Sequence, residues 1–497
     1  MDPDTSRPGP TAGAPPAAQV AAPVRTAPGP VPRIPVPGLR FGLLATVQVL
    51  VNAGVTVTST AGPAIERDLA LSHAQLVLAG SAYGLAFSGL LLLGGRLTDL
   101  TDQRRAFILG AAVVALGSAA AAVSTGAGTL IATRFLAGCG AALAAPAAMA
   151  LLGALFPGAP RRARAISLWG SLSSVGASAG ILLSGVLVTL LTWRWVFGAL
   201  AVVAAASALA APRVLPRVPP PSTGRVDVAG AALATTGLGA TGYGLAMAGT
   251  HGWSTVQVLV PLGAGILLLV AFAAVEKKIA QPLLPPRLLA PASRVIALLT
   301  SMIGPAGGAS TAFLLSLYFQ QVRGWSPLAT ASVFVPYSVV LAVTGLLSGR
   351  LADRVGARRL IPVGILATAA GLALISRLTP AGPLGVPLVL GLLVLPVGIA
   401  LTVSGAVATA MAGVPARHAG LAAGVMNTAL LTGATMGVAV LTSLADGRTA
   451  ALLHATPSAA AVGGYAHAFA LAAVAFLLAA VLVAAGLRSR SGGRHRR

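Results

Sequence analysis

The charged residues best placed to do chemistry occur in two copies of one pattern of glycine, arginine and aspartate. Its charged and glycine positions are Gly95, Arg96, Asp99, Arg104 and Arg105 in the first copy, and Gly349, Arg350, Asp353, Arg354, Gly356 and Arg358 in the second. Carboxylates beside arginines and helix N-termini form charge-assisted hydrogen bonds, so these loops are candidates for a conformational latch. The alternative is a solvated turn in which each aspartate caps the next helix.

A single arginine, Arg134, lies inside an apolar stretch long enough to cross a membrane. It follows Thr129 by five residues, which places it about 8 Å in from one end of a helix. A charge at such a depth costs at least about 2.5–3.5 kcal/mol and is a candidate for function by default. We expect Arg134 to face a central cavity; the alternative is that its long side chain reaches back to the membrane interface.

Uncharged polar residues and one aspartate at the edge of an apolar stretch could line a cavity or take up a proton. They are Asn52, Tyr83, Gln320, Gln321, Asn427 and Asp227. Each uncharged one could equally form a helix–helix hydrogen bond. Small residues recur every four positions at Gly176, Gly180 and Ser184, next to Gly185, and such a stripe predicts close helix packing.

These residues stand in a chain dominated by apolar side chains. Of 497 residues, 56% are hydrophobic and 9% are charged, and the mean hydropathy is +0.89. Soluble proteins carry about 25% charged residues, which argues against a soluble enzyme here. The net charge of +23 could suggest a nucleic-acid partner, but the basic residues fall in short clusters between apolar runs, as in membrane proteins. The one cysteine, Cys139, excludes an internal disulfide, and no metal, cofactor or phosphate-binding pattern is visible.

Fourteen apolar stretches have about the 20 residues that a helix needs to cross a bilayer. They cover approximately residues 41–64, 75–95, 106–125, 129–153, 165–190, 195–211, 228–248, 255–275, 295–319, 327–349, 360–377, 384–411, 420–444 and 463–487. The predicted fold is an all-α integral membrane protein with 14 transmembrane helices. Residues 1–40, rich in proline and alanine, are expected to form a disordered tail, and residues 488–497 a basic tail.

The distribution of lysine and arginine predicts the orientation of these helices. With the N-terminus in the cytoplasm, the segments on the inside carry 27 Lys and Arg residues and those on the outside carry 5. Positive charge is enriched on the cytoplasmic side of membrane proteins, so both termini are predicted to lie inside. This arrangement requires an even number of spans.

The repeated loop resembles the hallmark loop of the major facilitator superfamily, most closely in its second copy, Gly349 to Gly356. The stretch Arg134 to Gly138 resembles that superfamily's arginine-bearing fourth helix, and fourteen spans resemble its drug:proton antiporter branch. The resemblance implies two six-helix bundles with pseudo-two-fold symmetry, at residues 41–211 and 295–487, and two inserted linker helices at 212–294. It implies export of hydrophobic drugs or antibiotics by alternating access across the plasma membrane, without enzymatic activity or cofactor. Alternatives are a carrier for lipids or metabolites and a non-transporting membrane sensor or scaffold.

Several positions depart from the pattern of that branch. Gly54 stands where its exporters usually carry an acid in the first helix, and the helix-5 motif at Gly180 to Gly185 lacks its proline. None of the ten acidic residues lies near the middle of a predicted span. Proton uptake by Asp227 or Asp99 at the membrane edge is one alternative for energy coupling. The other is weak or absent coupling, or coupling carried by a substrate that itself titrates. We favour weak coupling because edge carboxylates are well hydrated.

Overall fold

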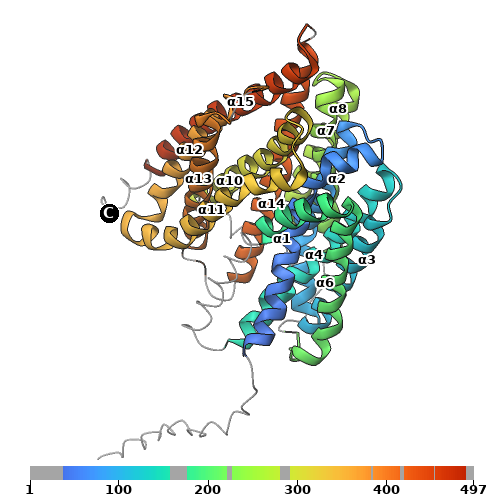
Figure 1. Ribbon diagram of the computed structural model, residues 1–497. Helices are drawn as coiled ribbons and strands as arrows, with labels where there is room; N and C mark the ends of the chain where they lie inside the picture. The colour runs from blue at the N-terminus through green and yellow to red at the C-terminus, as the bar shows by residue number, and fades with distance from the viewer. Residues whose placement is uncertain are drawn as a thin grey trace, which may run out of the picture. The chain divides into compact units, whose positions relative to one another are not determined.

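The computed structural model describes residues 37–156, 176–220, 227–279, 292–381, 384–412, 414, 419–452 and 454–488. Within these ranges the chain is helical and contains no strand (Figure 1). The long helices are α1 Pro37–Asp68, α2 His73–Leu100, α3 Gln103–Ala122, α4 Ala127–Leu155, α6 Trp193–Val214, α7 Val228–His251, α8 Val256–Glu276, α10 Ala292–Leu317, α11 Pro327–Val355, α12 Ala357–Ile375, α13 Val386–Met411, α14 Ala419–Ala451 and α15 Pro457–Arg488.

Two shorter elements complete the described helices. A helix covers Gly176–Leu190, and the π-helix η1, Tyr318–Val322, continues α10. Eleven of the described helices are long and apolar enough to cross a membrane. Each of the fourteen predicted spans coincides with a helix, except that residues 165–175 of the fifth lie outside the described residues. The predicted all-α membrane fold is confirmed. The predicted tails lie outside the described residues, apart from 37–40 and 488.

Side chains at the loop ends define where several helices begin. The Ser72 hydroxyl accepts a hydrogen bond from the backbone N–H of Gln75, and the Gln75 side chain accepts one from the backbone N–H of Ser72, which forms a capping box at the start of α2. The Asp102 side chain caps α3 by accepting from the backbone N–H of Arg105, and Ser326 caps α11 ahead of Pro327. These polar caps start each new helix within a few residues of the end of the preceding one.

Small residues allow neighbouring helices to approach closely. A Cβ at Gly94 of α2 would lie under 2 Å from the carbonyl oxygen of Ala142 in α4. Gly110 and Gly117 of α3 meet the backbone of α4 in a similar way, and Gly398 of α13 meets that of α12 at Thr368. Such contacts replace the hydrophobic driving force that is absent between helices in lipid.

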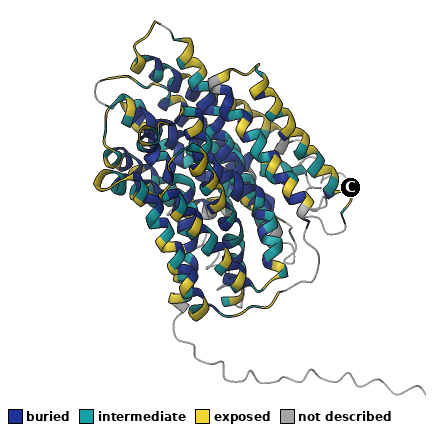
Figure 2. Cartoon of the chain, turned by 90° about the vertical axis from the view of Figure 1, so that its right-hand side faces the viewer, coloured by how far each residue is buried: buried dark blue, intermediate teal, exposed yellow. Residues whose placement is uncertain are grey.

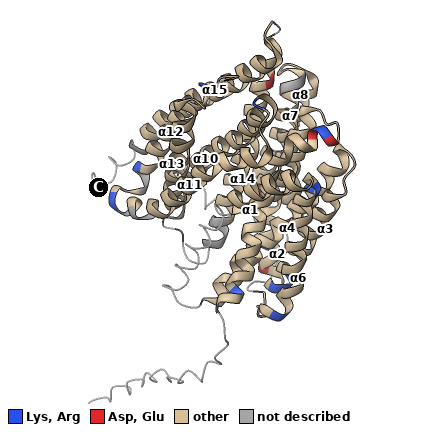
Figure 3. Cartoon of the chain, in the orientation of Figure 1, with Lys and Arg blue, Asp and Glu red and all other residues tan. Residues whose placement is uncertain are grey.

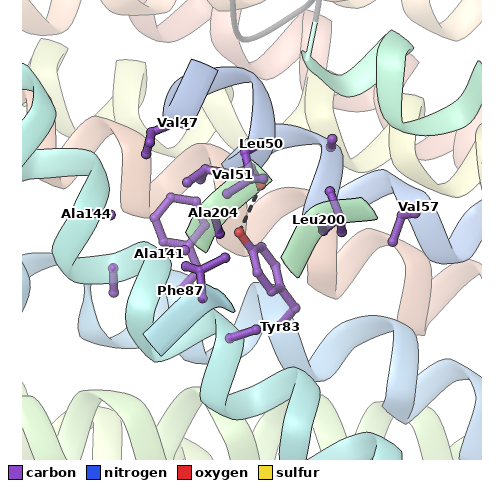
Figure 4. Close-up of a cluster of buried hydrophobic side chains, with 14 of the residues drawn as sticks. Val47, Leu50, Val51, Val57, Tyr83, Phe87, Ala141, Ala144, Leu200 and Ala204 are labelled. Atoms are coloured by element: carbon purple, nitrogen blue, oxygen red, sulfur yellow. Dashed lines mark hydrogen bonds between the residues drawn. The ribbon is translucent and has the colours of Figure 1, made fainter. Parts of the chain in front are cut away.

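The buried apolar side chains form two large clusters. The first draws its buried residues from α1, α2, α3, α4 and α6, with Leu215 just beyond (Figure 4 shows part of it). The second draws mainly on α10 to α15 and η1, and includes Leu76, Val77, Ile181 and Ala246 from other helices. Helix α7 packs on α2, α8 and α14, so the inserted pair contacts elements of both clusters.

The outward faces of the helices remain apolar. On α8 the exposed side chains include Leu259, Val260, Leu267 and Val270, and on α15 they include Val481 and Leu482. Figure 2 shows such exposed residues along the outer helices, and Figure 3 shows that the described charged residues gather towards helix ends. A soluble protein rarely exposes so much contiguous apolar surface, whereas lipid tails cover it without cost.

We expect Gly94→Ala to destabilise the fold, because the new methyl group would collide with the α4 backbone, which cannot rotate away. Overpacking of this kind costs about 1–3 kcal/mol. Gly345→Ala on α11 is the matched control: a Cβ there meets nothing within 4 Å, and removing a helical glycine should stabilise by about 0.5–1 kcal/mol. Thermal unfolding of the two purified variants in detergent checks this. Equal midpoints would contradict the close approach of α2 and α4.

Candidate functional site

Arg134 is the largest fully buried side chain among the described residues, with 2% of its surface exposed. Its guanidinium donates three hydrogen bonds to backbone carbonyls. Nη1 donates to Gly54 of α1 at 2.8 Å, Nε to Ala79 of α2 at 3.2 Å, and Nη2 to Gly80 of α2 at 3.1 Å. The planar fork of an arginine suits several acceptors at once. Arg134 therefore joins α4 to α1 and α2.

Aromatic rings complete the surroundings of this buried charge. The guanidinium carbon lies 5.1 Å from the ring centre of Tyr83 and 5.7 Å from that of Phe197 on α6. Tyr83 donates its hydroxyl hydrogen to the Val51 carbonyl at 3.0 Å (dashed line in Figure 4). Carbonyl dipoles and ring faces thus take the place of a carboxylate around Arg134.

Gly54 stands where exporters of the resembled branch usually carry an acid, and its carbonyl binds Arg134. A Cβ at Gly54 would be 2.9 Å from Cζ of Tyr83 and 3.0 Å from its hydroxyl oxygen. The tyrosine ring therefore fills the space that a longer side chain at position 54 would need. The missing acid in α1 and the tyrosine in α2 belong to one local arrangement.

That Arg134 faces a central transport cavity stays a prediction. Arg134 lines a cavity of about 10 Å³, room for roughly one water. The lining residues are Leu50, Gly54, Tyr83, Val114, Ser118, Ala121, Arg134, Ala137, Phe197 and Leu200, all from the first six helices. The side chain does not reach the interface. Its three carbonyl bonds hold it inside, because a buried guanidinium needs its donors paired.

In the first copy of the repeated loop, the described contacts stay within the first six helices. Asp102 caps α3 through the backbone N–H of Arg105 at 3.0 Å. Arg104 donates to the carbonyls of Pro212 and Leu215 at the end of α6, at 3.0 and 3.3 Å. Exposed Asp99 interacts electrostatically with Arg96, while Gly95 approaches only Pro146 of α4.

In the second copy, Gly356 ends α11 with φ of +90°, a backbone conformation that glycine adopts without strain. Its N–H donates to the Ala352 carbonyl at 2.9 Å. Arg354 is exposed. The side chains of Arg350, Asp353 and Arg358, and the surroundings of Gly349, lie outside the described residues.

The two glutamines of η1 connect the helices before and after the inserted pair. Gln320 Nε2 donates to the Thr60 carbonyl of α1 and to the Ser316 hydroxyl, each at 3.0 Å. Gln321 Nε2 donates to Oε2 of Glu66 at 2.7 Å. Both glutamines therefore lie at a contact between the two large helix groups. They belong to a π-helical turn, which is wider than an α-helical one and changes the direction in which their side chains point.

The remaining polar candidates differ in their surroundings. Asn52 bonds back to the Gln48 carbonyl at 2.8 Å, and Asn427 is exposed. Asp227 is buried and caps α7 through the N–H of Gly230 at 2.8 Å. Its second oxygen has no hydrogen-bond partner, and it lies close to the buried carboxylate of Glu276.

The small-residue stripe at 176–185 faces two different neighbours. Gly176 and Gly180 meet the α1 backbone at Val49 and Ala53, and Ser184 donates to the Val57 carbonyl at 3.0 Å. Gly185 instead approaches the side chain of Ala331 on α11. Only this last position contacts the second helix group.

A cluster of titratable residues was not found from the sequence. His73, at the start of α2, lies between Glu66 of α1 and Asp446 of α14, with nitrogen–oxygen distances of 3.7 and 3.5 Å. Nearby, Asp68 accepts hydrogen bonds from Trp193 and Arg194 at the start of α6. Each of these residues stands at the end of a predicted span with no spacing that links it to the others, so only folding reveals the cluster.

This is a multi-span membrane protein. Its helices are long enough to cross a membrane, their outer faces are apolar, their charges lie towards the ends, and the buried Arg134 is hydrogen-bonded to backbone carbonyls. The chain belongs to the Major Facilitator Superfamily, a family of transporters, whose family model matches residues 44–438. It is 37% identical to the puromycin resistance protein pur8 of Streptomyces alboniger, over 90% of this chain and 89% of that protein. It is also 37% identical to the cephamycin export protein CmcT of Amycolatopsis lactamdurans, over 82% and 85% of the two chains.

Two further comparisons agree. The methylenomycin A resistance protein of Bacillus subtilis is 31% identical over 90% of this chain and 94% of its own. Among solved structures, the peptide transporter POT in complex with sulfate superposes with a TM-score of 0.64 at 18% identity, covering 90% and 94% of the two chains. At that identity the likeness shows the fold alone. The predicted superfamily is confirmed.

Gly54→Asp should be destabilising because its side chain must displace the Tyr83 ring. In a Tyr83→Ala background the space is free and the new carboxylate can pair with Arg134, so the penalty should shrink or reverse. We expect a coupling of about 1–3 kcal/mol in this double-mutant cycle, measured by chemical unfolding in detergent. Gly128→Asp, at an exposed position with open space, is the control and should be additive with Tyr83→Ala. Additivity at Gly54 would refute the arrangement.

Proposed function

We propose that this protein exports a hydrophobic drug or antibiotic across the plasma membrane of a bacterium. The observation that carries the proposal is similarity along nearly the whole chain, at 37% identity, to proteins named for puromycin resistance and cephamycin export. A carrier matched over this length shares both helix groups that must move, rather than one common segment. Of the predicted alternatives, a carrier for another substrate class is the rival that the test below addresses.

Our proposed mechanism is alternating access between residues 41–211 and 295–487, with 212–294 as the inserted helices. Polar contacts between these halves support the division. They include Gln320 with Thr60, Gln321 with Glu66, His73 with Asp446, and the Leu328 N–H with the Thr189 hydroxyl at 3.1 Å. All four lie at the same end of the helices, which the 27:5 charge asymmetry assigns to the outside. We therefore infer that both termini are cytoplasmic and that this conformation is closed outwards.

The repeated loop is proposed as the latch on the cytoplasmic side. In the first copy Arg104 and Asp102 are bound to α6 and α3 of their own half, which leaves them poorly placed to reach across. The second copy keeps the full motif and is therefore the better candidate for the contact between halves. Arg134 has a different proposed role: it holds α1, α2 and α4 together as one rigid unit, which a rocking motion requires.

Drug export is tested by expressing the protein in a drug-sensitive bacterium that lacks its major exporters. Cells with the protein should accumulate several-fold less puromycin or hydrophobic dye than cells with empty vector. In liposomes with an imposed pH gradient, weak coupling predicts little uphill accumulation of a substrate without titratable groups. Unchanged accumulation in cells whose membranes hold the protein would overturn export. Strong uphill transport that a protonophore abolishes would overturn weak coupling.

Asp353→Asn should abolish most transport, whereas Asp99→Asn should retain a larger share, because the second loop copy is proposed to carry the latch. Both changes are isosteric and remove one charge, so each serves as the other's control. Initial rates of dye efflux, normalised to protein in the membrane, measure the effect. A parental rate for Asp353→Asn together with a loss for Asp99→Asn would reverse the assignment.

A further inference from the structure

The polar contact around His73 joins three helices across the two proposed halves. His73 Nδ1 lies 3.7 Å from Oε1 of Glu66, and Nε2 lies 3.5 Å from Oδ1 of Asp446. Nε2 is buried and has no hydrogen-bond partner. The Phe313 ring of α10 packs 6.4 Å from the imidazole, which limits access of water on that side. We call Glu66, His73 and Asp446 the outer cluster.

Other polar groups surround the outer cluster. Gln321 of η1, which is uncharged, donates to Glu66, and Tyr465 of α15 lies within electrostatic reach of both carboxylates. Arg194 of α6 forms an ion pair with Asp68 of α1. At the same end of the helices, α7 carries His251, which is exposed at the end of its helix.

The charge of the imidazole decides whether this arrangement is attractive. A protonated histidine carries two N–H donors and one positive charge, so it can serve both carboxylates at once. A neutral imidazole has one N–H and turns a lone pair towards the other carboxylate, which leaves the two negative charges to repel. Glu66 and His73 belong to the same half, so separation of the halves would take Asp446 away from the imidazole and let water reach it. The closed arrangement therefore holds the proton more tightly than the open one.

We propose that His73 is a proton-binding site that locks the outer side of the transporter, with Glu66 and Asp446 as its two anionic partners. The proposal rests on the alternating-access function and orientation proposed above. A state that binds a proton more tightly is favoured as pH falls, by linkage. Histidine titrates near pH 6.5 in the absence of perturbation, so the lock operates in the physiological range.

This site differs from an ordinary coupling site because the proton enters and leaves on one side only. Opening releases the proton to the outside and closing recovers it, with no net transfer across the membrane. The site therefore sets how readily the carrier opens outwards at a given external pH.

The test measures the distance between the two halves directly. Spin labels are attached to Leu191→Cys and Ala455→Cys in a Cys139→Ser background; both label sites are exposed, in loops of opposite halves. Double electron–electron resonance of the full-length protein in nanodiscs is recorded from pH 5 to pH 9. We expect a short distance at pH 5.5 that gives way to a longer one above about pH 7.5, with the slope of a single proton.

His73→Gln should remove this pH dependence, and Asp446→Asn should move its midpoint to lower pH by weakening the hold on the proton. His251→Gln is the matched control, a histidine on the same side of the membrane, and should keep the parental profile. A parental distance that does not change with pH, or an unchanged profile in His73→Gln, overturns the proposal. If His73→Gln fails to fold, as judged by size-exclusion chromatography, the midpoint of Asp446→Asn decides.

The outcomes separate this proposal from the proposed function. A pH-dependent distance that His73→Gln abolishes, in a protein that does not lower drug accumulation in cells, supports the lock and overturns drug export. Export without any pH-dependent distance change overturns the lock alone.

Discussion

The hydrocarbon of a bilayer offers no hydrogen bonds to a polypeptide, and most features of this protein follow from that constraint. The described backbone satisfies itself in helices, and many hydroxyls bond back to their own helix, as Thr98 does to the Gly94 carbonyl and Thr368 to that of Gly364. Charged side chains lie mainly towards helix ends (Figure 3). Close packing through glycine then supplies cohesion that apolar contacts cannot supply in lipid.

Arg134 is the exception to that distribution, and it explains a second set of features. Its three bonds to carbonyls tie α4 to α1 and α2, and the Tyr83 and Phe197 rings enclose it. With this arrangement no acid is needed at Gly54, since the ring of Tyr83 fills the space beside it. We propose that this charge stabilises the inside of one half, as a carrier that moves its halves as rigid bodies requires.

The contacts between the halves are of another kind. They consist of a few polar pairs at one end, together with close approaches such as that of Gly84 in α2 to Thr435 in α14. Polar pairs near the membrane surface can exchange their partners for water at little cost, whereas buried apolar surfaces cannot. An interface of this type can open and close. Its stability can depend on the binding of a proton, as we propose for His73.

The sequence by itself determined the helices, their number and their proposed direction, because apolar length and the position of basic residues are properties of the chain. The motif at Gly349 to Gly356 likewise identified the superfamily. Only the tertiary structure decided which way each polar group faces. Arg134 binds carbonyls that lie 54 to 80 residues away on α1 and α2, and no spacing in the sequence indicates these partners. Glu66 and Asp446 meet at His73 for the same reason: hydropathy sets the length of a helix, whereas packing sets its neighbours.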